Sequence, residues 1–99
     1  MSDNTATNGG GINNVGTAKL FRSTVTDNYA VQTGGGIFNN GGGSVTLDHS
    51  TVLRNRAIHG TGGGIDNAPG GTVTLLHSTF HQNHPNHCVP LSSIPGCNG

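Results

Sequence analysis

The sequence predicts an all-β fold, a parallel β-helix (solenoid) of about 3.5 coils with 25–28 residues in each coil. Three observations lead to this prediction. A Gly-Gly-Gly-Ile motif occurs three times, a Ser-Thr-Val or Ser-Thr-Phe motif ending in Asn follows each copy, and glycine accounts for 18 of the 99 residues. No segment has an apolar period of 3.6 residues, so the repeats are not helical.

The two motifs repeat in the same phase. The glycine triplets begin at Gly9, Gly34 and Gly62, with spacings of 25 and 28 residues. The second motif begins at Ser23, Ser50 and Ser78, with spacings of 27 and 28 residues. Two independent motifs that keep one phase through three copies indicate a structural repeat.

Each repeat contains three strand-like segments. Residues 45–47 and 73–75 alternate apolar and polar side chains, as a half-buried strand does. The Ser-Thr-Val segment has the same character with the opposite parity, which requires a corner near Asp48 and His49. The third segment is Gly-Gly-Gly-Ile, entered through residues that tolerate a positive φ. We therefore expect three strands and three corners per coil.

Stacking these coils about 4.8 Å apart aligns equivalent residues in columns. The inward apolar columns contain Ile12/Ile37/Ile65, Ala18/Val45/Val73, Leu20/Leu47/Leu75 and Val25/Val52/Phe80, with Ala30/Ala57 at a corner. Asparagine forms two more columns, in which side-chain amides can bond along the axis and the backbone tolerates left-handed corners. The expected structural residues are Gly34, Gly35, Gly36, Gly62, Gly63, Gly64, Asn14, Asn39, Asn67, Asn28, Asn55 and Asn83.

The start of the chain carries no cap in this alignment. Residues 1–6 align with residues 25–30, so Met1 occupies an apolar column in mid-coil. We expect residues 1–87 to be the C-terminal part of a longer solenoid; a short protein that dimerises through its open end is the alternative. An uncovered first coil also predicts self-association, because unpaired strand edges and apolar side chains meet there.

Residues 88–99 break the repeat and are expected to form an irregular C-terminal cap. They contain two prolines and both cysteines of the chain. A disulfide between Cys88 and Cys97 would close a short loop and fits an oxidising compartment. Free thiols or a metal-binding pair are the alternatives.

The paired motifs resemble the repeats of the polymorphic outer-membrane protein family, which carry GGA[ILV] and FxxN. Here the first motif reads GGGI, with Gly11, Gly36 and Gly64 in place of the family alanine, and only Phe80-His81-Gln82-Asn83 meets the second in full. The chain also resembles secreted bacterial β-helix proteins with a pectin-lyase-like fold. This resemblance implies a right-handed helix, an extracellular or cell-surface location and a mostly non-enzymatic, adhesive role.

Composition excludes several other classes of protein. Four Lys and Arg balance four Asp, so the net charge is zero and no nucleic-acid partner is expected. No run approaches the roughly 20 apolar residues of a transmembrane helix. Residues 1–10 do not read as an export signal. The glycine triplets lack the Lys and hydroxyl residue of a phosphate-binding loop, and no cofactor is expected.

Catalytic residues are not expected in this chain. Asp3 and Asp27 share one column, where two carboxylates about 5 Å apart would suit a retaining glycosidase. Arg54 continues that column, however, and an ordinary surface ion pair with Asp27 is the favoured interpretation. The aspartate, GHG and RIK motifs of polygalacturonases are missing, as is a calcium cluster of the pectate-lyase type.

Six histidines raise the question of a metal site. Four of them cluster with Cys88 near the end of the repeats, namely His77, His81, His84 and His87. Strand and cap geometry does not bring this spacing together, so no metal site is expected. His49 and His77 share a corner column with Arg22 that faces solvent.

The sequence therefore favours a non-enzymatic structural or adhesive segment that presents corner and loop side chains to a glycan or a surface protein. The expected contact loops are residues 29–33 and 56–61, and the expected binding residues are Tyr29, Arg56 and His59. The alternative is the scaffold part of a polysaccharide-active enzyme, similar to a pectate lyase or glycoside hydrolase, whose catalytic coils lie upstream.

Overall fold

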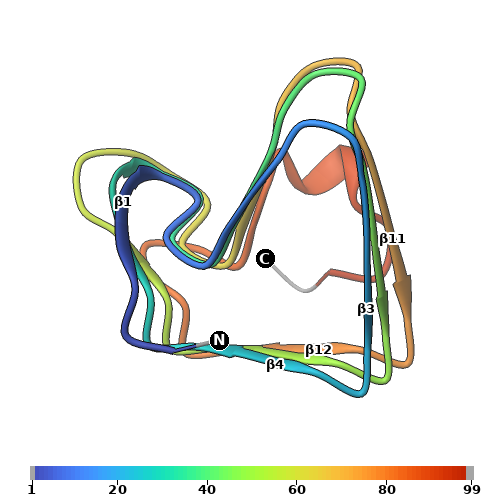
Figure 1. Cartoon of the computed structure of the whole chain (residues 1–99), viewed down its shortest axis with the longest axis horizontal. Coiled ribbons are helices and arrows are strands. Elements are labelled where there is room, and N and C mark those ends of the chain that lie inside the picture. Colours follow the sequence, from blue (N-terminus) through green and yellow to red (C-terminus); the bar gives the residue numbers. More distant parts are fainter. Residues whose placement is uncertain (1, 98–99) are drawn as a thin grey trace.

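The computed structural model describes residues 2–97 (of Leu91, only the backbone) and shows a β-solenoid of about three stacked turns (Figure 1). In chain order the elements are β1 (Thr5–Asn8), β2 (Ile12–Asn14), β3 (Thr17–Phe21), β4 (Thr24–Thr26), β5 (Tyr29–Thr33), β6 (Ile37–Asn39), β7 (Ser44–Asp48), β8 (Thr51–Leu53), β9 (Arg56–Ala57), β10 (Ile65–Asn67), β11 (Thr72–Leu76), β12 (Thr79–His81), β13 (Cys88–Val89) and the 3-10 helix η1 (Leu91–Ser93).

The strands form four parallel sheets, one on each side of the coil. Their orders are β1-β5-β9, β13-β10-β6-β2, β11-β7-β3 and β12-β8-β4. Each pairing joins equivalent positions of neighbouring coils; Ala18, for example, pairs with Val45, which pairs with Val73. The repeat phase read from the sequence therefore sets the register.

The prediction of three strands per coil was wrong, because residues 29–33 form β5 rather than a loop. Residues 56 and 57 form β9, which pairs with β5, and Ala30 and Ala57 lie inside these strands instead of at a corner. In β5 the large side chains of Tyr29 and Val31 face solvent, whereas small Ala30 faces inward. Because the large side chains face outward and the small one inward, the sequence pattern does not predict this strand.

The glycine triplets explain why small residues face inward there. Each triplet begins with a positive φ, at Gly9 (64°), Gly34 (68°) and Gly62 (70°). The middle glycine then lies against the backbone of the fourth strand: a Cβ on Gly35 would stand 2.5 Å from both the N and C atoms of Arg56. Figure 1 shows the resulting indented outline, in which the chain doubles back beside the lobe that carries β1. Glycine is required by this close approach as well as by the turn.

The left-handed corners do not fall on asparagine, contrary to expectation. Among the described residues the non-glycine positions with positive φ are Asp3, Arg22, Asp27, His49, Arg54, His77 and Gln82, with values of 49–56°. Four of them immediately precede an asparagine of the Asn28 column. The corner residue points outward and the following asparagine turns inward, where its amide can bond along the axis.

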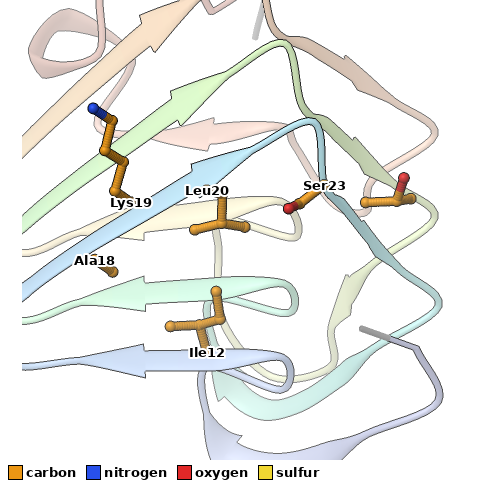
Figure 2. A pocket seen from close by; sticks show the side chains of 6 residues that line it. Ile12, Ala18, Lys19, Leu20 and Ser23 are labelled. Carbon is orange, nitrogen blue, oxygen red and sulfur yellow. The ribbon is translucent and has the colours of Figure 1, made fainter.

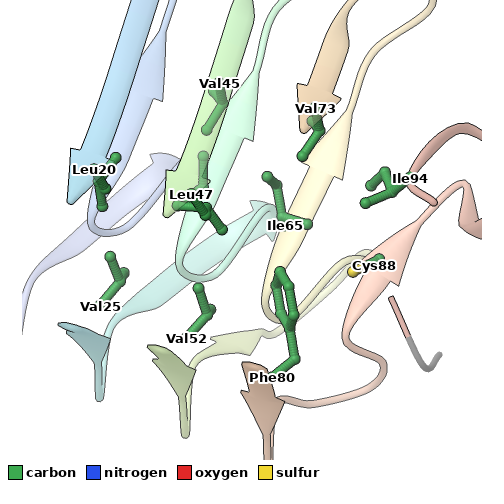
Figure 3. Packing of buried hydrophobic residues seen from close by; sticks show 11 residues of the cluster. Leu20, Val25, Val45, Leu47, Val52, Ile65, Val73, Phe80, Cys88 and Ile94 are labelled. Atoms are coloured by element: carbon green, nitrogen blue, oxygen red, sulfur yellow. The ribbon is translucent and has the colours of Figure 1, made fainter. Parts of the chain in front are cut away.

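The core is one apolar cluster, made of the inward columns together, that runs the length of the solenoid (Figure 3). Val45, Leu47, Val52 and Ile65 are fully buried, and Phe80 closes the column of Val25 and Val52 in the last coil. Each coil thus needs only a few apolar side chains, because the neighbouring coils cover them on both sides.

Three polar ladders run beside this core. Asn14 Nδ2 donates to Asn39 Oδ1 (2.9 Å), and Asn39 Nδ2 donates to Asn67 Oδ1 (2.9 Å). The column of Asn28, Asn55 and Asn83 forms a second ladder of this kind. The third consists of hydroxyls: the Oγ atoms of Ser50 and Ser78 accept bonds from the backbone N–H of the serine one coil earlier.

The C-terminal segment covers the last coil. β13 pairs with β10, and Ile94 is buried against the apolar column. Ser93 Oγ accepts from Asn67 Nδ2 (3.2 Å), which ends the first asparagine ladder. Cys88, itself buried, forms a disulfide with Cys97.

Reduction of this disulfide is expected to destabilise the fold by about 2–3 kcal/mol, because it closes a short loop that covers the core. The Cys97→Ser variant should lose a similar amount in urea denaturation. Adding dithiothreitol to that variant should change nothing further. Equal stability of the oxidised and reduced chains would contradict this expectation.

His87 ends the second asparagine ladder and makes the cap sensitive to pH. Asn83 Nδ2 lies 3.1 Å from His87 Nδ1. An amide N–H can only donate, so Nδ1 must be unprotonated. Burial lowers the pKa of His87, and the nearby His81 lowers it further.

The folded protein therefore binds fewer protons at His87 than the unfolded chain does. Its contribution to stability is complete above the unfolded pKa, about 6.5, and is lost as the pH falls towards the lower folded value. We expect the melting temperature to decrease between pH 7 and pH 5. A His87→Gln variant should show a smaller decrease, and His59→Gln, away from the ladder, should retain the full decrease.

Candidate functional site

A hollow of about 390 Å³ lies on the corner between the β4-β8-β12 sheet and the β1-β5-β9 sheet. Two columns of outward side chains form its walls, and Asn55 of the buried ladder forms its floor. Its lining residues are Asp3, Asp27, Tyr29, Arg54, Asn55, Arg56, Gln82 and His84.

The first wall is the corner column that contains Asp27 and Arg54. Both residues have a left-handed backbone, with φ values of 56° and 52°. This conformation directs their side chains away from the core, and the parallel stacking places one above the other on neighbouring coils. Asp3 and Gln82 continue the column in the coils on either side.

Asp27 and Arg54 form the surface ion pair expected from the sequence. Arg54 Nε donates to Asp27 Oδ1 (3.0 Å) and Nη2 donates to Oδ2 (3.2 Å). These bonds, and a third from Thr26 Oγ1, hold the pKa of Asp27 below its usual value. The bond to Asp27 in turn raises the pKa of Arg54. Both side chains are about half exposed, so the pair fixes the shape of the wall more than it stabilises the fold.

The second wall contains Tyr29, Arg56 and His84. Tyr29 pairs with Arg56 across β5 and β9, and Arg56 pairs with His84 in an isolated bridge. Two of the three expected binding residues thus stand on adjacent strands. His59 lies on the bend after β9, where its backbone N–H bonds to Val31 O, and does not line the hollow.

The charges of the two arginines differ in how they are balanced. Arg54 has a carboxylate partner, whereas Arg56 makes no ion pair within residues 2–97. Asp3 stands two coils from Arg56, about 10 Å along the axis. The hollow therefore offers a guanidinium and an adjacent phenol ring for recognition from outside.

The same arrangement is poorly suited to acid–base catalysis. Asp27 is held ionised by its bonds to Arg54 and cannot readily donate a proton as a general acid must. Elsewhere Asp48 bonds to His49 Nδ1 (2.6 Å), and Asp66 accepts from Thr33 Oγ1. These two aspartates do not line the hollow.

Within the part of the chain that the structure describes, no three His, Cys, Asp or Glu side chains are placed to hold a metal ion. The histidine and cysteine cluster seen in the sequence is divided among other contacts. His87 bonds to Asn83, Cys88 is in the disulfide, and His49 and His77 stack at the solvent-facing corner with ring centroids 4.9 Å apart.

Gln82 and His84 belong to the hollow but were not singled out as binding residues. The repeat alignment contains the signal that places them: Gln82 is equivalent to Asp27 and Arg54, and His84 to Tyr29 and Arg56. Reading whole columns, rather than separate loops, would have found both residues.

A second, apolar hollow of about 590 Å³ lies at the first coil. Ile12, Ala18 and Leu20 line it, while Lys19 points away from them (Figure 2). These residues head the inward columns that are covered by neighbouring coils further along, and no coil of the described residues covers this end of the core.

Comparison of the chain with protein-family models, with curated proteins and with solved structures finds no match in any of the three. The described residues contain no helix long and apolar enough to cross a membrane. Fold and site together define a parallel β-solenoid repeat protein with an outward-facing polar hollow on one corner.

Proposed function

We propose that this chain is a non-enzymatic, adhesive segment of a secreted or cell-surface β-solenoid, and that the corner hollow contacts a glycan or protein partner. The observation that carries the proposal is the pairing of Tyr29 with Arg56 on two hydrogen-bonded strands. An exposed ring and an unpaired guanidinium on a rigid backbone are suited to recognition. Of the two carboxylates that line the hollow, that of Asp27 is held by Arg54.

The resemblance of the GGGI and FxxN motifs to polymorphic outer-membrane protein repeats supports an extracellular location. The Cys88–Cys97 disulfide supports the same location, since such bonds persist in oxidising compartments. A right-handed, pectin-lyase-like coil is part of this proposal.

The alternative is that the chain is the scaffold part of a polysaccharide-active enzyme. One observation favours it: Asp3 and Asp27 both line the hollow, on successive coils. Catalysis by this pair would require the Asp27–Arg54 bonds to open.

A glycan array and a reducing-sugar release assay on the same protein separate these functions. We expect binding without turnover, and an affinity about fivefold lower for Arg56→Gln, since exposed charge pairs contribute up to about 1 kcal/mol. Arg22→Gln, an exposed arginine on another corner, is the matched control. Sugar release that Asp3→Ala and Asp27→Ala abolish would establish the enzyme instead.

The uncovered first coil supports a further part of the proposal, self-association of the chain. The outer edges of β2 and β3 border the apolar hollow at Ile12, Ala18 and Leu20. Sedimentation velocity should show association that rises with concentration and weakens in Ala18→Glu. Thr74→Glu, which faces outward on β11 of the same sheet, is the control. A monomer at all concentrations would exclude self-association.

A further inference from the structure

The outer face of the β1-β5-β9 sheet differs from the other outer faces of the solenoid. Tyr29 and Val31 of β5 are each 42% exposed, and Ile58, which follows β9, is 46% exposed. Ile58 N–H bonds to Ala30 O, so its side chain stands beside that of Val31, as Arg56 stands beside Tyr29. We call these four side chains the β5 face.

The β5 face is apolar, aromatic and rigid. Among the described residues, three of the six exposed large apolar side chains lie on it, although it spans only β5 and the segment of β9 that continues to Ile58. Ala30 and Ala57 are buried beneath it, and the glycine triplets pack directly behind these strands. Exposed polar residues adjoin it: Thr5 of β1 pairs with Tyr29, and Gln32 and His59 directly follow Val31 and Ile58 in the chain.

This composition is typical of the energetic centre of a protein–protein contact. Tyrosine and arginine dominate such centres, and a surrounding rim of polar residues excludes water from them. A patch of clustered apolar side chains rimmed by polar groups also marks an interaction site more often than scattered exposed residues do.

The charge of the face defines the partner more closely. Arg56 has no carboxylate within ion-pair distance in the described residues, whereas Arg54, two residues earlier, donates two hydrogen bonds to Asp27. A partner that covers Val31 and Ile58 would bury one side of the Arg56 guanidinium. Such a charge must be paired when it is desolvated, so the partner must supply an acidic group.

We propose that the β5 face docks a protein surface that presents a carboxylate flanked by aliphatic side chains. The partner's carboxylate pairs with Arg56. One flanking aliphatic side chain of the partner packs on Val31 and Ile58, and the other packs on the ring of Tyr29. This inference rests on the proposed adhesive function and selects a protein, rather than a glycan, as the partner of this face.

In the test, each probe is titrated into the isotope-labelled full chain, and NMR spectra of the backbone amides monitor binding. The probes are acetyl-Leu-Glu-Leu-Glu-Leu-amide, its lysine counterpart acetyl-Leu-Lys-Leu-Lys-Leu-amide, and an uncharged and a uronate-containing oligosaccharide. We expect the acidic peptide alone to shift the amides of Tyr29, Val31, Arg56 and Ile58 at millimolar concentration. Binding should weaken with added salt, because the other side of the Arg56 guanidinium stays open to solvent and ions screen the pair from there.

Matched variants separate the charge from the apolar contact. Arg56→Gln should weaken the acidic peptide about threefold, and Ile58→Ser about fivefold. The controls are Arg22→Gln and Leu76→Ser, which remove an exposed arginine and an equally exposed aliphatic residue (45%) from other faces and should change nothing.

Four outcomes would overturn the inference. If the lysine peptide binds as tightly as the acidic peptide, Arg56 does not recognise a carboxylate. If the control variants weaken binding as much as Arg56→Gln and Ile58→Ser do, the binding site is not the β5 face. Binding of an oligosaccharide at these amides without the acidic peptide shows a glycan face, in which case the proposed adhesive function survives and the protein partner does not. If no probe binds, this inference fails, whereas the adhesive function is decided by the glycan array described above.

Discussion

Replacing Gly35 by alanine is expected to destabilise the solenoid by about 3 kcal/mol or more. The added Cβ would stand 2.5 Å from the backbone N and C atoms of Arg56 and from Gly63 O. These are backbone atoms of β9 and of the next glycine triplet, so no side chain can move aside to relieve the contact, and two coils must separate. Urea denaturation followed by circular dichroism measures the loss.

Two further glycines separate this contact from backbone strain. Gly42 has a φ of 80° with no atom within 4 Å of an added Cβ, so Gly42→Ala should cost about 1 kcal/mol from strain alone. Gly16 has neither feature, and Gly16→Ala should change stability by less than about 0.5 kcal/mol. If Gly35→Ala behaved like Gly16→Ala, the close approach of the triplet to the fourth strand would be wrong.

The Asn55→Ala variant is expected to lose about 3–5 kcal/mol of stability, because Asn55 is the central rung of a buried ladder. Its Oδ1 accepts from the backbone N–H and the side-chain amide of Asn28, both at 3.0 Å. Its Nδ2 donates to Asn83 Oδ1 (3.0 Å) and to Val25 O (2.9 Å). Truncation removes all four bonds where water cannot replace them, at about 1–3 kcal/mol for each buried group left unpaired.

Two companion variants show whether hydrogen bonding or volume is responsible. Asn55→Leu keeps most of the volume and should be as unstable as Asn55→Ala. Asn13→Ala removes an exposed asparagine outside the ladders and should cost less than about 1 kcal/mol. Thermal denaturation ranks all three. A stable Asn55→Leu variant would show that the ladder fills space without contributing bonds.

The two sets of variants act on neighbouring parts of one arrangement. A Cβ on Gly36 would stand 3.0 Å from Asn55 Nδ2, so the third glycine of each triplet leaves room for the ladder. This contact explains why the third position of each triplet is glycine. Glycine and asparagine are abundant together here because the absence of a glycine side chain leaves the space that the asparagine ladder occupies.

The candidate site shows how far columns can be read from a sequence. The Asp27–Arg54 pair followed from the repeat spacing alone, since equivalent positions on parallel coils must be neighbours. The sequence predicts Tyr29 and Arg56 as exposed loop residues, and the structure brings them together for a different reason, as outward positions of two paired strands. His59, predicted from the same exposed-loop pattern, lies beyond the end of β9 and away from the hollow.

The sequence by itself determined the repeat, the parallel stacking and the inward columns. Periodicity is a property of the chain, and once coils stack in register the neighbours of every residue follow from its place in the repeat. Met1, which the alignment put in an apolar column, lies outside the described residues.

Only the tertiary structure decided the number of sides of the coil and which residues turn its corners. β5 has small residues inward and large ones outward, because the glycine triplet lies directly behind it and leaves no space for a core. Its pattern therefore lacks the inward apolar residues by which strands are recognised. The left-handed backbone falls on Asp27, Arg54 and Gln82 for a related reason: their neighbours, the asparagines, are held in ladders that form only when coils stack.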